Sequence, residues 1–220
     1  MKRKIFILII LLLTITTISA NMETQLITHR TNTIEKIQQA IKKIEKPFVE
    51  IDVRKQNNEF IASHDKNPKN ITTIKQILTK FKNKTKFDFD LKEQGWETEF
   101  TDFLLQYLKP DQFIISSQYI ESLKKIKNHN SKIQLGIIIL KKGPITFAKN
   151  WIKSRLAPKS FIKIAKQNNL FIIPDQRFIN NNLLKTAEEN KIQIIPWTIK
   201  SNSKIQKLSK EKQIPMIISS

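Results

Sequence analysis

The chain of 220 residues contains no cysteine and only three glycines. Without cysteine it has no disulfide, no thiolate metal ligand, no cysteine nucleophile and no lipid-modified cysteine. Three glycines leave no glycine-rich phosphate loop, which argues against a nucleotide-binding fold of the Rossmann type. No linker rich in glycine, serine or proline divides the chain, and no internal repeat is present. We therefore expect a single domain.

Acidic residues are also scarce: 19 Asp and Glu stand against 39 Lys and Arg, a formal net charge of +20. Basic residues occur throughout the chain, and we interpret them first as a solvated surface. The alternative is attraction to an anionic membrane surface or to a phosphate-bearing small molecule. We expect no specific nucleic-acid partner.

The N-terminus has the pattern of a secretory signal peptide. Lys2, Arg3 and Lys4 precede an apolar run over residues 5–18, and Ala20 is a small residue at the expected cleavage point. We predict a signal peptide over residues 1–20 and an exported protein, whether periplasmic, secreted or at the cell surface. The alternative is a membrane anchor through residues 5–18, although a spanning helix needs roughly 20 apolar residues.

Short apolar strand patterns alternate with helical periodicity from Leu26 to the end of the chain. Helical patterns separate the strands, and residues 141–158 are expected to hold a loop and a short helix. Alternating βα units predict a parallel sheet, and eight strands predict a compact TIM-like (β/α)8 barrel over residues 21–220. An open doubly wound sheet is the alternative. The expected strands cover residues 26–29, 48–53, 87–91, 112–116, 133–139, 170–174, 192–198 and 214–219.

Two of these strands carry carboxylates at alternating positions. Glu50 and Asp52 share one face of the second strand, and Asp88, Asp90 and Lys92 share one face of the third. Burying several carboxylates is costly unless a cation compensates their charge. The pattern therefore predicts a metal site with hard oxygen ligands.

Two histidines follow strand patterns in the same way. His29 ends the first strand, and His64 ends an apolar run over residues 59–63. In a parallel barrel the carboxyl ends of the strands meet at one rim, where active sites lie. We expect both histidines to lie beside the carboxylates, with Trp197 near the end of the seventh strand. Imidazoles beside a metal indicate acid–base chemistry.

The ordered set of these motifs resembles the glycerophosphodiester phosphodiesterase family, over essentially all of residues 26–219. No single motif would suffice, and it is their order that is specific. The motifs are His29-Arg30, Glu50-Ile51-Asp52-Val53, His64-Asp65, Asp90-Leu91-Lys92, Ile114-Ile115-Ser116-Ser117, Pro196-Trp197-Thr198-Ile199 and Met216-Ile217-Ile218.

The resemblance implies a TIM-like barrel that hydrolyses a phosphodiester to an alcohol and glycerol phosphate with one divalent cation, Ca²⁺ or Mg²⁺. A hydroxyl of the substrate would attack phosphorus, and water would then open the resulting cyclic phosphate. The implied roles are metal ligands at Glu50, Asp52 and Asp90, acid–base catalysis by His29 and His64, phosphate binding by Arg30 and Lys92, and a substrate wall at Trp197.

The chain departs from the family pattern in four places. Thr31 replaces the glycine that normally follows His-Arg, and the next loop lacks its usual glutamate. Asp90 stands where the family usually has glutamate. Sphingomyelinase D enzymes, which resemble the same superfamily, also have aspartate at this place. The usual capping insertion is missing between His64 and Asp90. The alternatives are therefore phospholipase D-like action on lysophospholipids or sphingolipids, or a degenerate barrel that binds phospholipid headgroups without turnover.

Other residues compete for these roles. Asp88 shares a face with Asp90 and could replace it as a ligand. Ser116 and Ser117 lack a nearby base in a nucleophile motif, so a serine hydrolase is not favoured. His129 follows a helical pattern and is expected to be exposed, and Trp197 could equally be a core residue.

Overall fold

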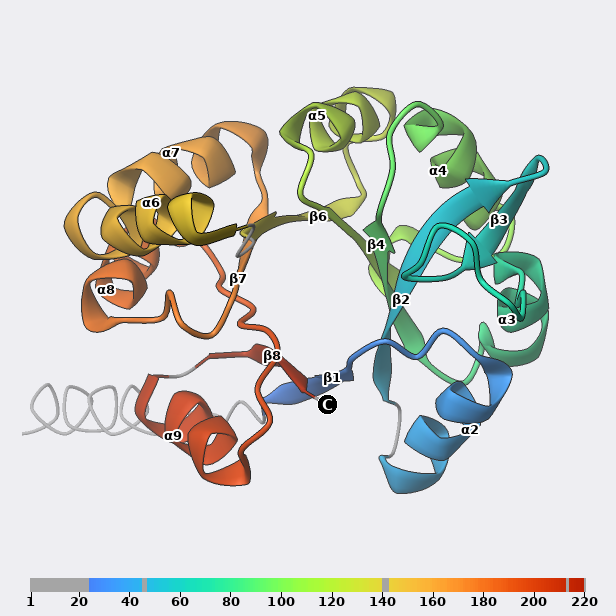
Figure 1. Ribbon diagram of the computed structural model, residues 1–220, viewed down its shortest axis with the longest axis horizontal. Coiled ribbons are helices and arrows are strands. Elements are labelled where there is room, and N and C mark those ends of the chain that lie inside the picture. The colour runs from blue at the N-terminus through green and yellow to red at the C-terminus, as the bar shows by residue number, and fades with distance from the viewer. Residues whose placement is uncertain (1–23, 45–46, 140–142, 213, 220) are drawn as a thin grey trace, which may run out of the picture.

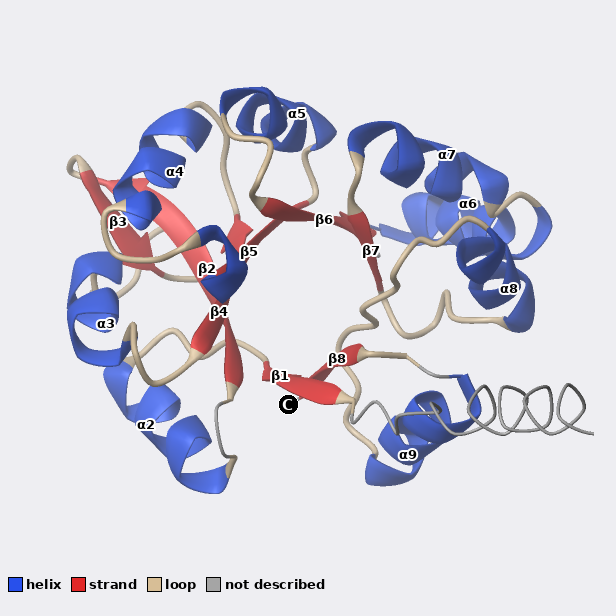
Figure 2. Ribbon diagram, turned by 180° about the vertical axis from the view of Figure 1, so that it is seen from behind, coloured by secondary structure: helices blue, strands red, loops and turns tan. Residues whose placement is uncertain are grey.

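The computed structural model describes residues 24–44, 47–139, 143–212 and 214–219. The predicted signal peptide or anchor at residues 1–20 lies outside these residues. The strands form one curved sheet with helices around its outside (Figures 1 and 2). They are β1 (Gln25–Thr28), β2 (Phe48–Gln56), β3 (Glu59–Ala62), β4 (Lys86–Leu91), β5 (Phe113–Ser117), β6 (Gln134–Ile139), β7 (Phe171–Pro174) and β8 (Met216–Ser219).

Helices fill most of the connections between the strands. No helix among the described residues has both the length and the apolar character needed to cross a bilayer. The helices are α2 (Ile34–Lys43), α3 (Ile74–Phe81), α4 (Glu97–Leu105), α5 (Ile120–His129), α6 (Gly143–Leu156), α7 (Lys159–Asn168), α8 (Asn181–Glu189) and α9 (Asn202–Lys212), with a 3₁₀ turn at Pro110–Gln112.

The sheet closes into a barrel through an irregular segment. Parallel pairing runs in the order β7-β6-β5-β4-β2-β1-β8. Isolated parallel bridges then join residues 194–199 to β7 on one side and to β8 on the other. Pro196 has no amide hydrogen to donate to β8, and its carbonyl accepts from the Ile218 amide. The predicted eight-position barrel is confirmed, with the predicted strand at 192–198 reduced to these bridges.

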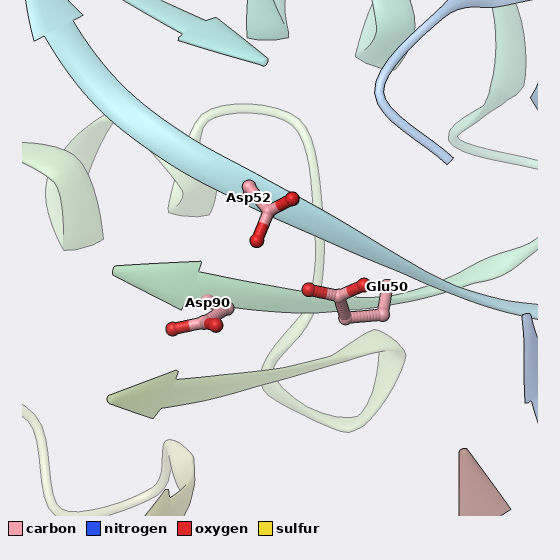
Figure 3. Close-up of side chains that lie close together, drawn as sticks. All are labelled: Glu50, Asp52 and Asp90. Atoms are coloured by element: carbon pink, nitrogen blue, oxygen red, sulfur yellow. The ribbon is translucent and has the colours of Figure 1, made fainter. Parts of the chain in front are cut away.

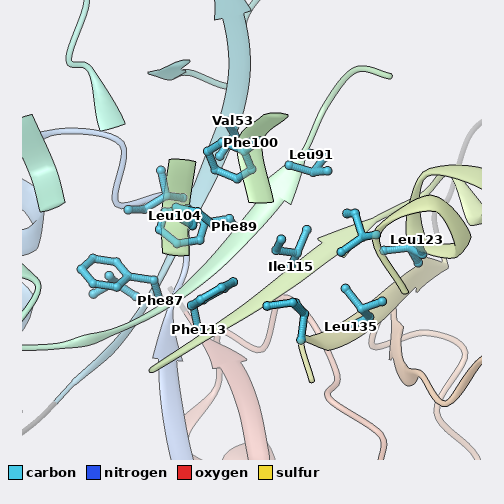
Figure 4. Packing of buried hydrophobic residues seen from close by; sticks show 14 of the residues in the cluster. Val53, Phe87, Phe89, Leu91, Phe100, Leu104, Phe113, Ile115, Leu123 and Leu135 are labelled. Atoms are coloured by element: carbon cyan, nitrogen blue, oxygen red, sulfur yellow. The ribbon is translucent and has the colours of Figure 1, made fainter. Parts of the chain in front are cut away.

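Alternation along the strands separates the barrel interior from the outer core. Val49, Ile51 and Val53 of β2 belong to the large cluster between sheet and helices, with Phe87, Phe89 and Leu91 of β4 (Figure 4). The even-numbered residues of the same strands point into the barrel. A smaller apolar cluster fills the interior, formed by Ile27, Phe48, Ile114, Ile173, Ile195 and Ile218.

Gly136 of β6 permits part of this interior packing. A Cβ at this position would lie 2.4 Å from Cδ1 of Ile173, closer than packed carbon atoms approach. The absence of a side chain therefore lets Ile173 of β7 fill the space beside β6.

Local signals fix the starts of several helices. The Thr73 hydroxyl accepts a hydrogen bond from the Gln76 amide, and the Gln76 side chain accepts one from the Thr73 amide. This capping box starts α3. Thr33 and Asn180 cap α2 and α8 with their side chains in the same way.

Two elements differ from the sequence prediction. Residues 143–156 form a helix of 14 residues, where a loop and a short helix were expected. The run over residues 59–62 is β3, which pairs antiparallel with β2 and stands outside the barrel ring. The β2–β3 hairpin is thus an excursion at the carboxyl end of β2, and His64 follows it.

Candidate active site

The carboxylates meet because β2 and β4 are paired in parallel. In this register Glu50 lies opposite Asp88, and Asp52 lies opposite Asp90. Oxygens of Glu50, Asp52 and Asp90 lie within 4.8 Å of one another, and all three residues are buried (Figure 3). Like charges directly opposite on neighbouring strands are destabilising, so this cluster needs compensation.

The segment that follows β1 holds the β2 carboxylates in place. The Arg30 amide donates to Glu50 Oε2 at 2.5 Å, and the Thr31 amide and hydroxyl both donate to the Glu50 carbonyl. Asn32 donates from Nδ2 to Asp52 Oδ2 at 2.7 Å and accepts from the Asp52 amide. Thr31 and Asn32 were not assigned roles from the sequence, since these contacts depend on the turn geometry.

Lys92 places a positive charge inside the cluster. Its ammonium lies 2.5 Å from Asp52 Oδ1 and also pairs with Asp90. Burial disfavours the charged ammonium, but Asp90 and Asp52 outweigh it and raise the pKa of Lys92. For Asp52, burial is likewise outweighed by Lys92 and Asn32, which lower its pKa.

One ammonium does not compensate the whole cluster. Burial, together with the charges of Asp52 and Asp90, raises the pKa of Glu50 well above its ordinary value. Burial also raises the pKa of Asp90, despite the nearby Lys92. A divalent cation would favour the ionised form of both groups.

The donor set fits a hard divalent cation. All three side chains offer carboxylate oxygens, which are the ligands that Ca²⁺ and Mg²⁺ prefer. Asp52 Oδ1 is buried, and its near partner is the Lys92 ammonium at 2.5 Å. The chemistry does not distinguish Ca²⁺ from Mg²⁺.

His29 lies beside this cluster at the end of β1. Its Nε2 is 3.8 Å from Glu50 Oε2, and its Nδ1 is 3.2 Å from the Thr198 hydroxyl. Burial, followed by the positive charge of Arg30, lowers the pKa of His29 to about 4. The imidazole is therefore neutral at pH 7 and can accept a proton.

His64 reaches the same cavity from the far side of the β2–β3 hairpin. Arg54 of β2 donates to the His64 carbonyl from Nε at 3.2 Å and from Nη2 at 2.9 Å. The Arg30 guanidinium lies 3.0 Å from His64 Nε2. A guanidinium can only donate, so Nε2 is the acceptor in this contact, and Nδ1 lies 3.3 Å from Asp65 Oδ1. The role of Arg54 was not predicted from the sequence.

A cavity of about 450 Å³ connects these groups. Both histidines, Arg30, Lys92, Glu50 and Asp90 line it. Its apolar wall consists of Ile138, Ile173, Trp197 and Ile218. The Trp197 ring is partly exposed, lies 6.2 Å from the His29 ring and donates from Nε1 to the Ile173 carbonyl.

The remaining candidates lie outside the cluster or are otherwise occupied. Asp88 is buried, and the Ser116 hydroxyl donates to it at 2.7 Å. The Ser117 hydroxyl donates to the Leu91 carbonyl. Neither serine is exposed, so neither is placed as a nucleophile. His129 is exposed on α5 and lies 2.6 Å from Asp102, as expected for a surface residue.

Comparison with protein-family models and with curated proteins finds no match. Comparison with solved structures finds a glycerophosphodiester phosphodiesterase from Agrobacterium tumefaciens at 9% identity and a TM-score of 0.68, covering 90% of this chain and 96% of that one. One from Parabacteroides distasonis has 14% identity and a TM-score of 0.67, covering 89% and 92%.

A phosphodiesterase from Oleispira antarctica, solved in complex with the product sn-glycerol-3-phosphate, has 16% identity and a TM-score of 0.62. The match covers 89% of this chain and 92% of that one. The similarity extends over nearly the full length of each structure, at sequence identities that show the fold. The chain therefore has the TIM-barrel fold of the glycerophosphodiester phosphodiesterases.

Proposed function

We propose that the protein is a metal-dependent phosphodiesterase that hydrolyses glycerophosphodiesters to an alcohol and glycerol phosphate. The observation that carries this proposal is the cluster of three buried carboxylates within 4.8 Å, which shares one cavity with two imidazoles. The likeness to structures of glycerophosphodiester phosphodiesterases supports it at the level of the fold.

Glu50, Asp52 and Asp90 would hold one divalent cation, Ca²⁺ or Mg²⁺. When bound, the cation would supply a Lewis acid that draws charge from phosphate oxygens. The Arg30 guanidinium and the Lys92 ammonium line the same cavity. They would bind phosphate oxygens through charge-assisted hydrogen bonds and offset charge as it develops.

The two histidines would move the protons. His29 is neutral and buried, which suits it to take the proton from the attacking hydroxyl of the substrate. The His64 side chain is 46% exposed and adjoins Asp65. It can therefore exchange protons with solvent and donate a proton to the leaving alkoxide. The roles would be reversed when water opens the cyclic phosphate.

A lysophospholipid is the second candidate substrate. Ile138, Ile173, Trp197 and Ile218 give the cavity an apolar wall that an acyl chain could contact. Only residues 63–73 connect β3 to α3, where a capping insertion would lie. Such a cavity could admit part of an acyl chain, and phospholipase D-like action would then compete with glycerophosphodiester hydrolysis.

Export is a further part of the proposal. It is supported by the basic and apolar pattern of residues 1–20. N-terminal sequencing of the protein from the producing cell would test it. A mature N-terminus near residue 21 is expected, whereas an intact leader in the membrane fraction would favour the anchor.

The deciding experiment measures hydrolysis of glycerophosphocholine, glycerophosphoethanolamine and lysophosphatidylcholine by chelator-treated protein, before and after Ca²⁺ or Mg²⁺ is restored. His64→Ala should abolish metal-dependent turnover. His129→Ala is the matched control, because this third histidine is exposed and lies outside the cavity lining. Activity should be retained in the control.

The substrate panel separates the candidates. Turnover of the glycerophosphodiesters supports the main proposal, and preferential turnover of lysophosphatidylcholine supports the second. A folded protein that binds the metal but hydrolyses none of the three substrates would overturn both. It would favour a barrel that binds headgroups without turnover.

A further inference from the structure

The positive charge of the chain is concentrated in one stretch. Residues 122–174 contain 12 Lys and Arg and no Asp or Glu. These 53 residues therefore carry 12 of the 20 net positive charges. The interpretation of the basic residues as evenly spread does not account for this stretch, which includes α6 and α7.

Exposed apolar side chains gather in the same stretch. The described part of the chain has five large hydrophobic residues with high exposure, and four of them lie between residues 151 and 164. They are Trp151 at 40%, Ile152 at 49%, Leu156 at 80% and Ile164 at 40%. Isolated exposed hydrophobic residues are ordinary, but a group with a cationic rim marks an interaction surface.

Trp151, Ile152 and Leu156 of α6 form one outward face. Side chains four residues apart lie on the same side of a helix, so Trp151 aligns with Arg155 and Ile152 aligns with Leu156. The Arg155 guanidinium lies 3.9 Å from the centre of the Trp151 ring. Ser154 faces the opposite way and is fully buried.

Lysines border this face. Lys149 is exposed and Lys153 is partly exposed, and no acidic side chain in the described residues forms an ion pair with either. We call Trp151, Ile152 and Leu156, together with Lys149, Lys153 and Arg155, the α6 patch. An apolar face bordered by lysine and arginine is typical of helices that lie in a membrane interface.

Hydrogen bonds place the α6 patch at the same end of the barrel as the cavity. The Asn180 side chain donates to the Ser154 carbonyl at 3.1 Å, and the Asn182 side chain donates to the Arg155 carbonyl. These asparagines begin α8, which follows the carboxyl end of β7. The carboxylates and Trp197 also lie toward the carboxyl ends of the strands. Figure 1 shows α6 beside α8, outside the ring of strands.

We propose that the α6 patch docks the protein on the surface of an anionic phospholipid bilayer, with the mouth of the cavity at the docked end. Charge complementarity selects this occupant, because the patch and the adjoining helix α7 contain lysine and arginine but no acidic residue. Each lysine or arginine near an anionic surface adds to the attraction. The three apolar side chains would enter the headgroup region.

The size of the patch argues against a stable protein partner. A specific protein interface involves roughly 20–30 residues on each side. The α6 patch offers three large apolar side chains within six positions of one helix. A bilayer needs no complementary shape, and each apolar side chain can enter its headgroup region independently of the others.

The test uses the full chain and vesicles of phosphatidylglycerol mixed with phosphatidylcholine, against vesicles of phosphatidylcholine alone. Brominated acyl chains should quench the Trp151 fluorescence on the anionic vesicles, and Trp151→Phe should remove this quenching. Residues 1–23 contain no tryptophan, so the readout does not depend on what the apolar leader does. Trp96 is buried and Trp197 lies in the cavity, and the quenching that remains in Trp151→Phe measures their contribution.

A second measurement tests the apolar face as a whole. A double variant, Ile152→Ser with Leu156→Ser, should weaken the contact between the α6 patch and the vesicle. We expect at least tenfold less quenching of Trp151 at matched lipid concentration. The matched control is Ile71→Ser, because Ile71 is 50% exposed but lies outside the patch. The control should be quenched as the wild type is.

Three results would overturn the proposal. The first is vesicle-bound protein in which Trp151 is not quenched, and the second is equal quenching on neutral and anionic vesicles. The third is concentration-dependent self-association that the double variant abolishes, with no contact to lipid, since the patch would then join two copies of the chain.

Discussion

The ammonium of Lys92 lies 2.5 Å from Asp52 Oδ1, at the position where the carboxylates of two strands converge. Lys92 also pairs with Asp90, so one side chain bridges β2 and β4. Without a metal, this ammonium is the charge that keeps the two carboxylates together. A divalent cation bound by the same oxygens would share them with Lys92 or displace it.

Lys92→Met should therefore destabilise the metal-free protein. Removing one partner from a buried ion pair costs about 3–5 kcal/mol, because the other partner is left uncompensated. We expect a loss in the free energy of unfolding within this range at pH 8 in chelator, measured with urea. The loss should be smaller at pH 5, where Glu50 and Asp90 can bind protons because their pKa values are raised.

Lys55→Met is the control for this substitution. Lys55 is also on β2 and pairs with Glu99, whose side chain is 52% exposed. Exposed pairs contribute only about 0–1 kcal/mol, so the control should stay near the wild type. Adding Ca²⁺ should restore more stability to Lys92→Met than it adds to the wild type. Equal stability of Lys92→Met and the wild type in chelator would show that Lys92 does not hold the cluster.

Arg30→Gly should separate stability from activity. Arg30 has a φ of +54°, a left-handed conformation that costs a non-glycine residue roughly 1–2 kcal/mol. Glycine relieves this cost but gains freedom in the unfolded chain, so the free energy of unfolding should stay within about 1 kcal/mol or rise. Loss of the guanidinium should lower kcat/KM at least about tenfold, as expected for a hydrogen bond to a charged group.

Asn58→Gly provides the matched backbone control. Asn58 has a φ of +63° and is exposed in the turn between β2 and β3, away from the residues that line the cavity. It should leave kcat/KM unchanged, and glycine should relieve less strain there than at Arg30, because asparagine adopts the left-handed conformation more readily than arginine. Full activity in Arg30→Gly would mean that the guanidinium does not contact the phosphate.

Much of the barrel and of the carboxylate cluster could be predicted because both depend on short periodic patterns. Strand positions follow from apolar runs, and two-residue alternation places Glu50 and Asp52 on one face. The register of the parallel pairing, which the structure supplies, then aligns Asp52 with Asp90. The barrel prediction is confirmed, while the catalytic and metal-binding roles stay predictions.

The rest depends on contacts between segments that no local pattern encodes. Asn32 holds Asp52 across 20 positions of the chain, and Arg54 holds the His64 backbone across a hairpin. The length of α6 was underestimated because Trp151, Ile152 and Leu156 are exposed, so its second half lacks the pattern of a core-facing helix. The strand expected at 192–198 formed only bridges, and Pro196 offers no amide hydrogen to β8.

Thr198→Val should lower kcat while leaving KM almost unchanged. The Thr198 hydroxyl lies 3.2 Å from His29 Nδ1 and orients the ring so that Nε2 faces the carboxylates. Loss of one neutral hydrogen bond, about 1 kcal/mol, corresponds to a decrease in kcat of about fivefold. Steady-state kinetics on the best substrate of the panel would measure it.

Thr198→Ser is the conservative control, because serine keeps the hydroxyl, and it should restore kcat. A parallel rise in KM for Thr198→Val would indicate damage to substrate binding. Equal kcat in the valine and serine variants would show that Thr198 does not position His29.

Asp88→Asn should make the metal-free protein less sensitive to rising pH. Burial raises the pKa of Asp88 to about 7, whereas an unfolded aspartate has a pKa near 3.8. The folded state therefore binds a proton more tightly than the unfolded state between these values, and stability falls as pH rises through this window. Asparagine cannot ionise and can still accept the hydrogen bond from Ser116. Urea unfolding in chelator should show similar stability of wild type and variant at pH 4, and a more stable variant at pH 8.

Asp111→Asn serves as the control. It is the same substitution of aspartate by asparagine, at an exposed position outside the barrel. Its stability should follow the pH dependence of the wild type. Lys92, Asp52 and Asp90 are present in both the wild type and Asp88→Asn, so the difference between the two curves isolates Asp88. A constant difference from pH 4 to pH 8 would mean that Asp88 carries the same charge in the folded and unfolded states, and the interior of the barrel would then be better solvated than its burial indicates.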